Sequence, residues 1–94
     1  MTKKEFERLY AEQNAIVDCN ELNADELEAV EEIVKANNLN KYALSTNNCE
    51  LDTIYVYCTD VETAINAILD NTCLFADEST EYAENYVKSN IYTA

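Results

Sequence analysis

The residues in this chain that could perform acid–base chemistry are its carboxylates. Nineteen of its 94 residues are Asp or Glu, and pairs such as Glu28 with Glu31 or Glu32 have the spacing of one helix face. Two carboxylates suffice for the hydrolysis of a glycosidic bond. In so acidic a chain, however, pairs of this kind arise by chance, so their presence alone does not indicate a catalytic site.

Nucleophilic catalysis finds little support in the residue types. The chain has no histidine, so neither a Ser–His nor a Cys–His pair can form. A reactive thiolate needs an electropositive neighbour, and the second half of the chain offers only Lys88. The absence of glycine excludes the glycine-rich phosphate loops and the nucleophile elbow. We therefore expect that the protein is not an enzyme.

Acids and cysteines are also common metal ligands. The four cysteines stand 30, 9 and 15 residues apart with no Cys-x-x-Cys pair, a spacing that does not fit a zinc site. The best match to a calcium-binding EF-hand loop begins at Asp70, but Leu74 occupies a ligand position and Phe75 the glycine position. We expect no metal and no cofactor. Two disulfides are formally possible, but buried or half-buried free thiols are expected, because nothing marks the chain as secreted.

The charge distribution is the most informative feature. Six bases oppose the nineteen acids, which gives a net charge of −13. Residues 18–34 contain seven acids and no base, and residues 42–87 contain nine more acids and only neutral residues otherwise. Such runs usually indicate a solvated surface. However, like charges destabilise a small fold by repelling one another, and solubility requires a net charge of only a few units. The Asn, Ile and Tyr content indicates an A/T-rich genome. Such a genome would also enrich lysine, whose codons are A-rich, and so make the chain more basic. We therefore interpret the acidity as selected.

Hydrophobic periodicity indicates which elements position these residues. Apolar side chains recur at i, i+3, i+4 and i+7, the pattern of a helix with one buried face. The four predicted helices cover residues 2–17, 24–37, 60–70 and 78–90. Before the second helix, Asn23 is the expected N-cap and Glu26 completes a capping box, while Asn37 and Asn38 end that helix. Because the chain lacks glycine, its twelve asparagines are expected to take over turn and cap positions.

The same stripes predict which residues face the core. Ile16 and Val17 are expected to extend the buried stripe of the first helix. Leu27, Val61 and Tyr82 are expected to point inward on the later helices. The expected N-caps of the last two helices are Asp60 and either Ser79 or Asp77.

Apolar and β-branched residues predict a hairpin over residues 42–58. Asn47-Asn48 suits a type I′ turn, a register that pairs Leu44 with Leu51. Residues 53–57 are apolar on both faces, so this strand is expected to be central or covered on both sides. Tyr55 and Tyr57 share one of its faces.

A third strand is predicted over residues 72–76, and the tail over 91–94 is expected to fray. The elements together predict the α+β class: a small antiparallel sheet packed with about four helices, in a single domain over residues 1–94. No apolar run approaches the roughly 20 residues of a membrane span, and the N-terminus does not resemble a signal peptide. We expect a soluble, cytoplasmic protein without membrane contact.

In size, charge and lack of catalytic residues, the chain resembles the small acidic inhibitors encoded by bacteriophages and mobile elements, including anti-CRISPR proteins and other DNA mimics. The resemblance lies in composition over the whole chain and carries no motif, so it assigns no site residue. It implies an inhibitor that binds the Lys/Arg-rich, nucleic-acid-binding surface of a host defence complex such as a CRISPR effector. A duplex as long as this domain, about 30 Å, carries roughly 18 phosphates, close to the number of carboxylates here.

Direct binding of nucleic acid by so acidic a chain is not expected, so the partner should be a basic protein. The acids expected to contact it are Asp25, Glu28, Glu31 and Glu32 on the second predicted helix, followed by Glu50, Asp52, Glu81 and Glu84. An exposed tyrosine pair beside acids would mark the binding face. The alternatives are an acidic adaptor, a phage structural or assembly protein, and an immunity-type inhibitor of a basic nuclease.

Overall fold

The computed structural model describes residues 2–18, 22–45, 53–71 and 79–94. The described elements alternate between helices and antiparallel strands, which confirms the predicted α+β class. In chain order they are α1 (Lys3–Gln13), β1 (Ala15–Asp18), α2 (Ala24–Asn37), β2 (Asn40–Ser45), β3 (Thr53–Cys58), α3 (Val61–Asn71), α4 (Thr80–Asn90) and β4 (Tyr92–Thr93). No helix in these ranges is both long and apolar enough to span a bilayer.

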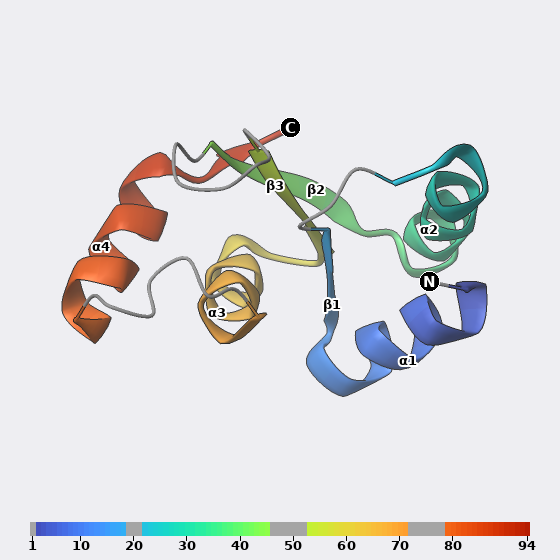
Figure 1. Cartoon of the computed structure of the whole chain (residues 1–94), viewed down its shortest axis with the longest axis horizontal. Coiled ribbons are helices and arrows are strands. Elements are labelled where there is room, and N and C mark those ends of the chain that lie inside the picture. Colours follow the sequence, from blue (N-terminus) through green and yellow to red (C-terminus); the bar gives the residue numbers. More distant parts are fainter. Residues whose placement is uncertain (1, 19–21, 46–52, 72–78) are drawn as a thin grey trace.

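The sheet has four strands in the order β1-β3-β2-β4. Strand β3 therefore has a hydrogen-bonded neighbour on each side, which confirms its predicted central position. Helices α3 and α4 pack on one face of the sheet, and α1 and α2 lie on the other side (Figure 1). Alternation along β3 sends Val56 toward α3 and Tyr57 toward α1 and α2.

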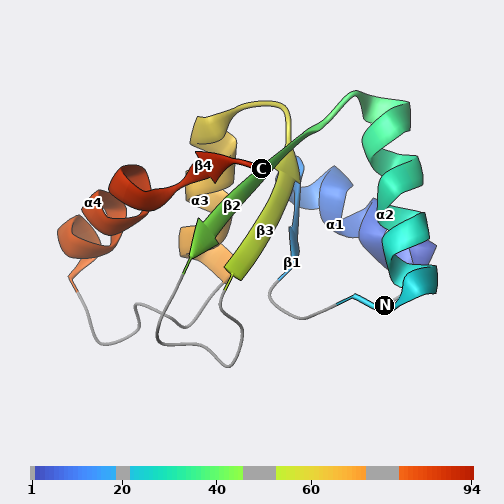
Figure 2. The same cartoon turned by 90° about the horizontal axis from the view of Figure 1, so that it is seen from above.

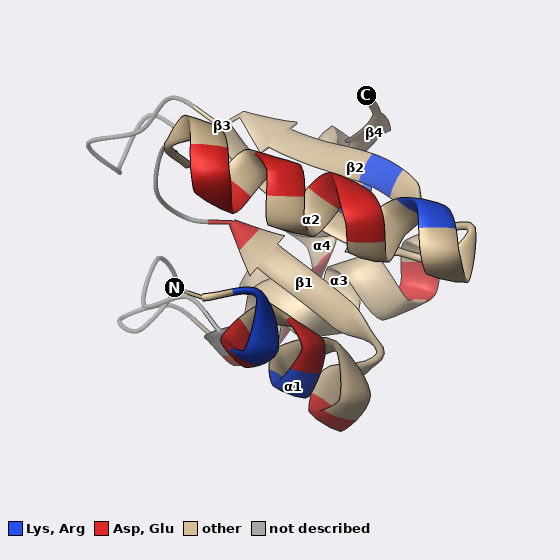
Figure 3. Ribbon diagram, turned by 90° about the vertical axis from the view of Figure 1, so that its right-hand side faces the viewer, with Lys and Arg blue, Asp and Glu red and all other residues tan. Residues whose placement is uncertain are grey.

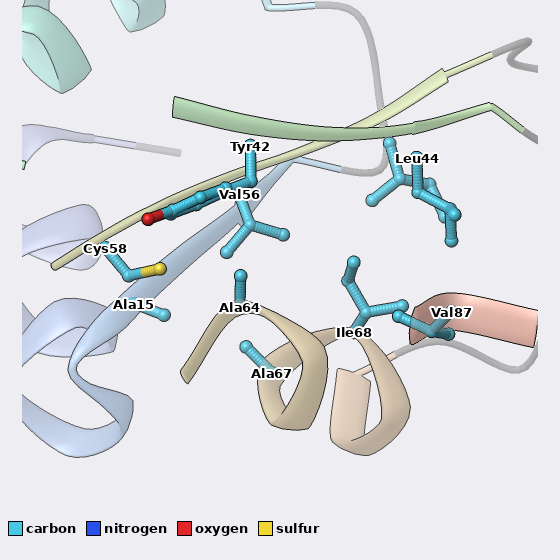
Figure 4. Close-up of a cluster of buried hydrophobic side chains, with 10 residues drawn as sticks. Ala15, Tyr42, Leu44, Val56, Cys58, Ala64, Ala67, Ile68 and Val87 are labelled. Atoms are coloured by element: carbon cyan, nitrogen blue, oxygen red, sulfur yellow. The ribbon is translucent and has the colours of Figure 1, made fainter. Parts of the chain in front are cut away.

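The larger group of buried side chains fills the space between the sheet and the α3–α4 layer. Leu44 and Val56 point from the sheet toward Ile68 of α3 and Val87 of α4 (Figure 4). Ala64 of α3 is also fully buried, and its small side chain lets the helix lie close to the strands. This cluster positions α4 and the side chains on it.

A second buried group joins α1 and α2 to the opposite side of the sheet. Phe6 is the buried residue of α1, and it packs in one cluster with Ile16 of β1, Val30 and Ile33 of α2 and Tyr57 of β3. Because Val30 and Ile33 fix the inward face of α2, the polar residues between them must face outward. The exposure of the α2 acids is thus a consequence of this cluster.

Side-chain caps determine where the helices begin and end. Complete capping boxes start α1 and α2, formed by Thr2 with Glu5 and by Asn23 with Glu26. Both helices end at an asparagine in the left-handed region, Asn14 with φ of 57° and Asn38 with φ of 55°. Asparagine tolerates this region better than other residues with a β-carbon, so the expectation for a glycine-free chain is confirmed at these positions.

The predicted helix over residues 2–17 is too long. Helix α1 ends at Gln13, and the left-handed Asn14 turns the chain into strand β1. Ile16 and Val17 therefore pair with Tyr57 and Val56 of β3 rather than extend a helical stripe. Their β-branched side chains suit a strand, and the pairing with distant residues overrides the local helical pattern.

The predicted pairing of the hairpin is also wrong. Leu44 lies opposite Ile54, not Leu51. The predicted turn at Asn47-Asn48 and the predicted strand over residues 72–76 lie outside the described residues. The tail was expected to fray, but Tyr92–Thr93 forms β4. It pairs with β2, and the Ala94 N–H donates to the Lys41 carbonyl at 2.9 Å.

Helices α2, α3 and α4 begin and end within about two residues of their predicted limits. Asp60 and Ser79 are confirmed as caps, because their side chains accept hydrogen bonds from the N–H groups of Thr63 and Tyr82. Three residues predicted to point inward are instead exposed, and each lies on the margin of its helix's buried stripe. They are Leu27 at 40% exposure, Val61 at 45% and Tyr82 at 51%.

Candidate functional site

Helix α2 is the most acidic element of the described chain. It carries five acids and one lysine, Lys35, which stands in its last turn. The acids recur along the length of the helix, as the red segments in Figure 3 show. The four acids of α2 that were predicted to contact a partner are all exposed, as their places outside the Val30–Ile33 stripe require. They are Asp25, Glu28, Glu31 and Glu32.

Two of the five α2 carboxylates already have partners within the fold. Glu26 accepts a hydrogen bond from the Asn23 N–H at 3.3 Å in the capping box. A Glu32 oxygen lies 2.8 Å from the Lys3 ammonium, and this hydrogen bond and ion pair lower the pKa of Glu32 and raise that of Lys3.

The other three acids, Asp25, Glu28 and Glu31, have no lysine or arginine within 4.0 Å among the described residues. They are spaced three residues apart, which corresponds to about 4.5 Å along a helix axis. One strand of a DNA duplex carries a phosphate about every 3.4 Å. The charge density along this side of α2 is therefore comparable to that of one nucleic-acid strand.

The neighbouring helix α1 does not extend this acidic surface. Its three acids are balanced by three bases, and Figure 3 shows both colours along it beside the uniformly acidic part of α2. Lys3 of α1 reaches Glu32 of α2 and lies 4.0 Å from Glu7 of its own helix. A cavity of about 260 Å³ lies between the two helices and is lined by this ion pair, Tyr10 and Ile33. We name Asp25, Glu28 and Glu31 the α2 triad, because they are the uncompensated part of this side of the molecule.

The second predicted group of acids is divided. Glu81 is exposed on α4 and Glu84 is partly exposed, whereas Glu50 and Asp52 lie outside the described residues. Helix α4 lies at the opposite end of the molecule's 35 Å axis from α2 (Figure 1). The structure therefore brings together the α2 acids but does not join them with those of α4.

Next to Glu81, α4 carries a tyrosine pair in which Tyr82 is exposed and Tyr86 is partly buried. The rings of Tyr82 and Tyr86 are stacked with their centroids 6.4 Å apart. The Tyr86 hydroxyl donates to the Ser45 carbonyl at 3.4 Å, which ties α4 to β2. An exposed aromatic pair beside acids is the feature expected of a binding face, and Tyr82 supplies its exposed ring because it points outward rather than inward.

Sequence reasoning missed a third group of polar and aromatic residues on the sheet. The Lys41 ammonium lies 4.3 Å from the centroid of the Tyr55 ring and 5.9 Å from that of Tyr57. The shared face of the two tyrosines was predicted, but Lys41 fell outside the predicted hairpin strand. Tyr92 could not be placed either, because β4 was not predicted.

Burial perturbs two ionisable groups in the core. The pKa of Tyr57 is raised to about 12, first by burial and then by the negative charges of Asp18, Tyr55 and Glu31. Burial also raises the pKa of the Cys58 thiol, whose Sγ donates to the Asp60 carbonyl at 3.1 Å.

Cys58 is free and buried, as predicted, while the other three cysteines lie outside the described residues. Within the described ranges, no group of three or more acids or cysteines could hold a metal ion.

No family model matches this chain, and comparisons with curated proteins and with solved structures give no match either.

Proposed function

We propose that the protein is a non-catalytic acidic inhibitor that binds a Lys/Arg-rich, nucleic-acid-binding surface of another protein through α2. The observation that supports this most directly is the α2 triad: three exposed carboxylates on one helix without a compensating base among the described residues. Carboxylates that remain unpaired within the fold are available to pair with a partner's lysines and arginines.

The proposed mode of action is replacement of phosphates by carboxylates. A surface that binds nucleic acid is lined by Lys and Arg, which neutralise the phosphates and release the counterions condensed on the nucleic acid. The α2 triad offers a similar charge spacing on a rigid helix, so it can occupy the same groove and exclude the nucleic acid. The expected target is a host defence complex such as a CRISPR effector, in the host cytoplasm, with the net charge of −13 steering the encounter.

An adaptor with an apolar interface finds less support. The large apolar residues that are exposed in the described chain lie on four different elements, of which α2 and α4 are at opposite ends of the molecule (Figure 1). They are Leu27 on α2, Val61 on α3, Tyr82 on α4 and Tyr92 on β4. A contiguous apolar patch would be needed for such an interface, so the distribution favours a charged contact.

The test compares two triple variants of equal net charge. The first, Asp25→Asn/Glu28→Gln/Glu31→Gln, neutralises the α2 triad, and the second, Glu12→Gln/Glu62→Gln/Asp70→Asn, neutralises three exposed acids on α1 and α3. Binding to a candidate CRISPR effector, and competition with its DNA, would be measured over a range of salt concentrations. We expect the first variant to bind more weakly and its affinity to depend less on salt, and the second to change little.

Two outcomes would contradict the proposal. Equal weakening by the two variants would mean that net charge acts without a specific contact at α2. Tight, salt-insensitive binding by both variants would mean that the interface is not made of carboxylates.

A further inference from the structure

We propose that the open face of the sheet, formed by Lys41, Tyr55 and Tyr92, is a second contact surface that receives an arginine side chain of the basic partner. This inference rests on the proposed function, since it takes the partner to be basic. It adds a contact outside α2 and specifies the side chain that the contact prefers.

The register of the strands places these residues on one face. Tyr42 and Leu44 of β2 point into the core beneath α3 and α4, so Lys41 and Ala43 point to the opposite side. Ala43 lies opposite Tyr55 of β3 and also opposite Tyr92 of β4. Residues paired in this way share a face, so the two tyrosines stand in one row, about 10 Å apart across the sheet.

This row is not covered by a described helix. In the view from above, the described helices lie beside or behind β2 and β3, and none lies in front of them (Figure 2). Exposure varies along the row: Ala43, between the two tyrosines, is fully buried, Tyr55 is partly exposed and packs against the α1–α2 cluster, and Tyr92 is 49% exposed. We call Lys41, Tyr55 and Tyr92 the open tyrosine face.

The open tyrosine face already holds a cation of its own. The exposed Lys41 has its ammonium 4.3 Å from the Tyr55 ring centroid, within the range of a cation–π contact. Negative charge stands close by: Asp18 of β1 lies opposite Tyr55 of β3, and after burial the charges of Asp18 and Glu31 contribute to the raised pKa of the neighbouring Tyr57. Glu31 belongs to the α2 triad, so the open tyrosine face is continuous with the acidic surface of the proposed function.

The chemistry of the face favours arginine over lysine as the incoming group. A guanidinium is planar and weakly hydrated, so it stacks on an aromatic ring at a smaller desolvation cost than an ammonium. An exposed lysine is held only weakly by a tyrosine ring, so a partner's guanidinium can replace the Lys41 ammonium on Tyr55. The exposed Glu31 then supplies the complementary charge, and Tyr92 flanks the site.

The experiment measures discrimination rather than affinity. The intact protein would be titrated by calorimetry with an oligo-arginine peptide and with an oligo-lysine peptide of equal length and charge. We expect the arginine peptide to bind about three- to fivefold more tightly, as one or two cation–π contacts would produce. Tyr55→Leu and Tyr92→Leu should each bring this ratio toward one, while Tyr55→Phe, which keeps an aromatic ring, should preserve it.

Lys41→Met should increase the ratio, because it removes the competing ammonium but keeps an apolar stem. Folding of every variant would be checked by its amide NMR spectrum, and Tyr92→Leu, at an exposed position, keeps the test valid if Tyr55→Leu unfolds. A ratio that both leucine variants leave unchanged would overturn the inference.

The outcomes separate this inference from the proposed function. If neutralising the α2 triad weakens both peptides but the wild-type ratio is one, the proposed function stands and the tyrosine contact is wrong. If the double variant Asp25→Asn/Glu28→Gln, which leaves Glu31 in place, changes neither affinity, the proposed function is wrong, and the ratio still tests the tyrosine contact. Failure of both peptides to bind overturns both ideas. Self-association that Tyr92→Leu abolishes would mean that the face binds a second copy of the chain. Binding of single-stranded DNA that Tyr55→Leu abolishes would mean that it binds bases. Either result would overturn the inference.

Discussion

The ammonium of Lys3 lies 2.8 Å from a carboxylate oxygen of Glu32 and so connects the charge-balanced helix α1 to the acidic helix α2. Both side chains are about half exposed, so the pair can open to solvent or to a partner. While it is closed, it removes one of the four predicted contact acids from the surface that a basic partner would meet.

Replacing Lys3 with Gln should therefore strengthen binding to a basic partner, because it frees Glu32. The affinity should also become more dependent on salt concentration. In an NMR titration of the carboxyl groups, the pKa of Glu32 should rise toward its ordinary value, because the Lys3 hydrogen bond and charge that lower it are gone. The matched control is Lys4→Gln, which removes the same charge from the next position; an equal effect of both variants would assign the change to net charge alone.

Tyr57 should make stability fall at alkaline pH. Its pKa is raised to about 12 in the folded protein, against about 10 in an unfolded chain, so the folded state holds this proton more tightly. The resulting stabilisation is complete below pH 10 and is lost as the pH rises through 12. The loss should appear in urea unfolding measured across this pH window, and Tyr57→Phe should reduce it. Near-ultraviolet absorbance would monitor the titration of the seven tyrosines. If all of them titrated together near pH 10, the prediction would be contradicted.

Phe6 should be the residue on which the docking of α1 depends. It is 2% exposed and is the buried side chain of its helix, so Phe6→Ala should lower the free energy of unfolding by about 3–5 kcal/mol. Leu9→Ala, at a partly buried position of the same helix, should cost clearly less. Urea unfolding of the two variants would decide this, and equal losses would mean that α1 is held by its whole surface rather than by one anchor.

The two left-handed asparagines should tolerate glycine but not alanine. Asn14 and Asn38 have φ of 57° and 55°, a region that asparagine tolerates better than alanine because its short polar side chain can hydrogen-bond locally, so each Asn→Ala change should destabilise the fold by about 1 kcal/mol. The corresponding Asn→Gly changes should be nearly neutral or slightly stabilising. Asn85→Ala, at an exposed position inside α4, is the control and should not destabilise. Thermal unfolding would check all of these, and equal effects of Ala and Gly at Asn14 would contradict the assigned backbone geometry.

Helices α2, α3 and α4 were predictable because their signals are local. The Asn23 and Glu26 side chains bond to backbone groups within three residues, and the buried stripe of α2 is set by its own spacing. Strands β1 and β4 were not predictable in the same way. Ile16 and Val17 fit a helical stripe as well as a strand, and only the partner strand β3, far along the chain, decides between them.

The candidate site shows the same division. The exposure of Asp25 and Glu28 follows from helical periodicity, so this part of the site could be derived from the sequence. The pairing of Glu32 with Lys3 could not, because it depends on how α1 packs beside α2. The open tyrosine face depends on the sheet order and on β4, which arise from contacts between distant segments.

The pairing of β1 with β3 has a consequence for synthesis on the ribosome. It joins Ala15 to Cys58 and Asp18 to Tyr55, residues that are 43 and 37 positions apart. At a translation rate of about 5–20 residues per second, the nascent β1 waits roughly 2–8 s for its partner strand to be made. During this interval Phe6 and Ile16 have no sheet to cover them, so the N-terminal segment is the part of the nascent chain most open to chaperones. The hairpin strands β2 and β3, which lie close together in the chain, are expected to pair first and to serve as the template on which β1 closes the sheet.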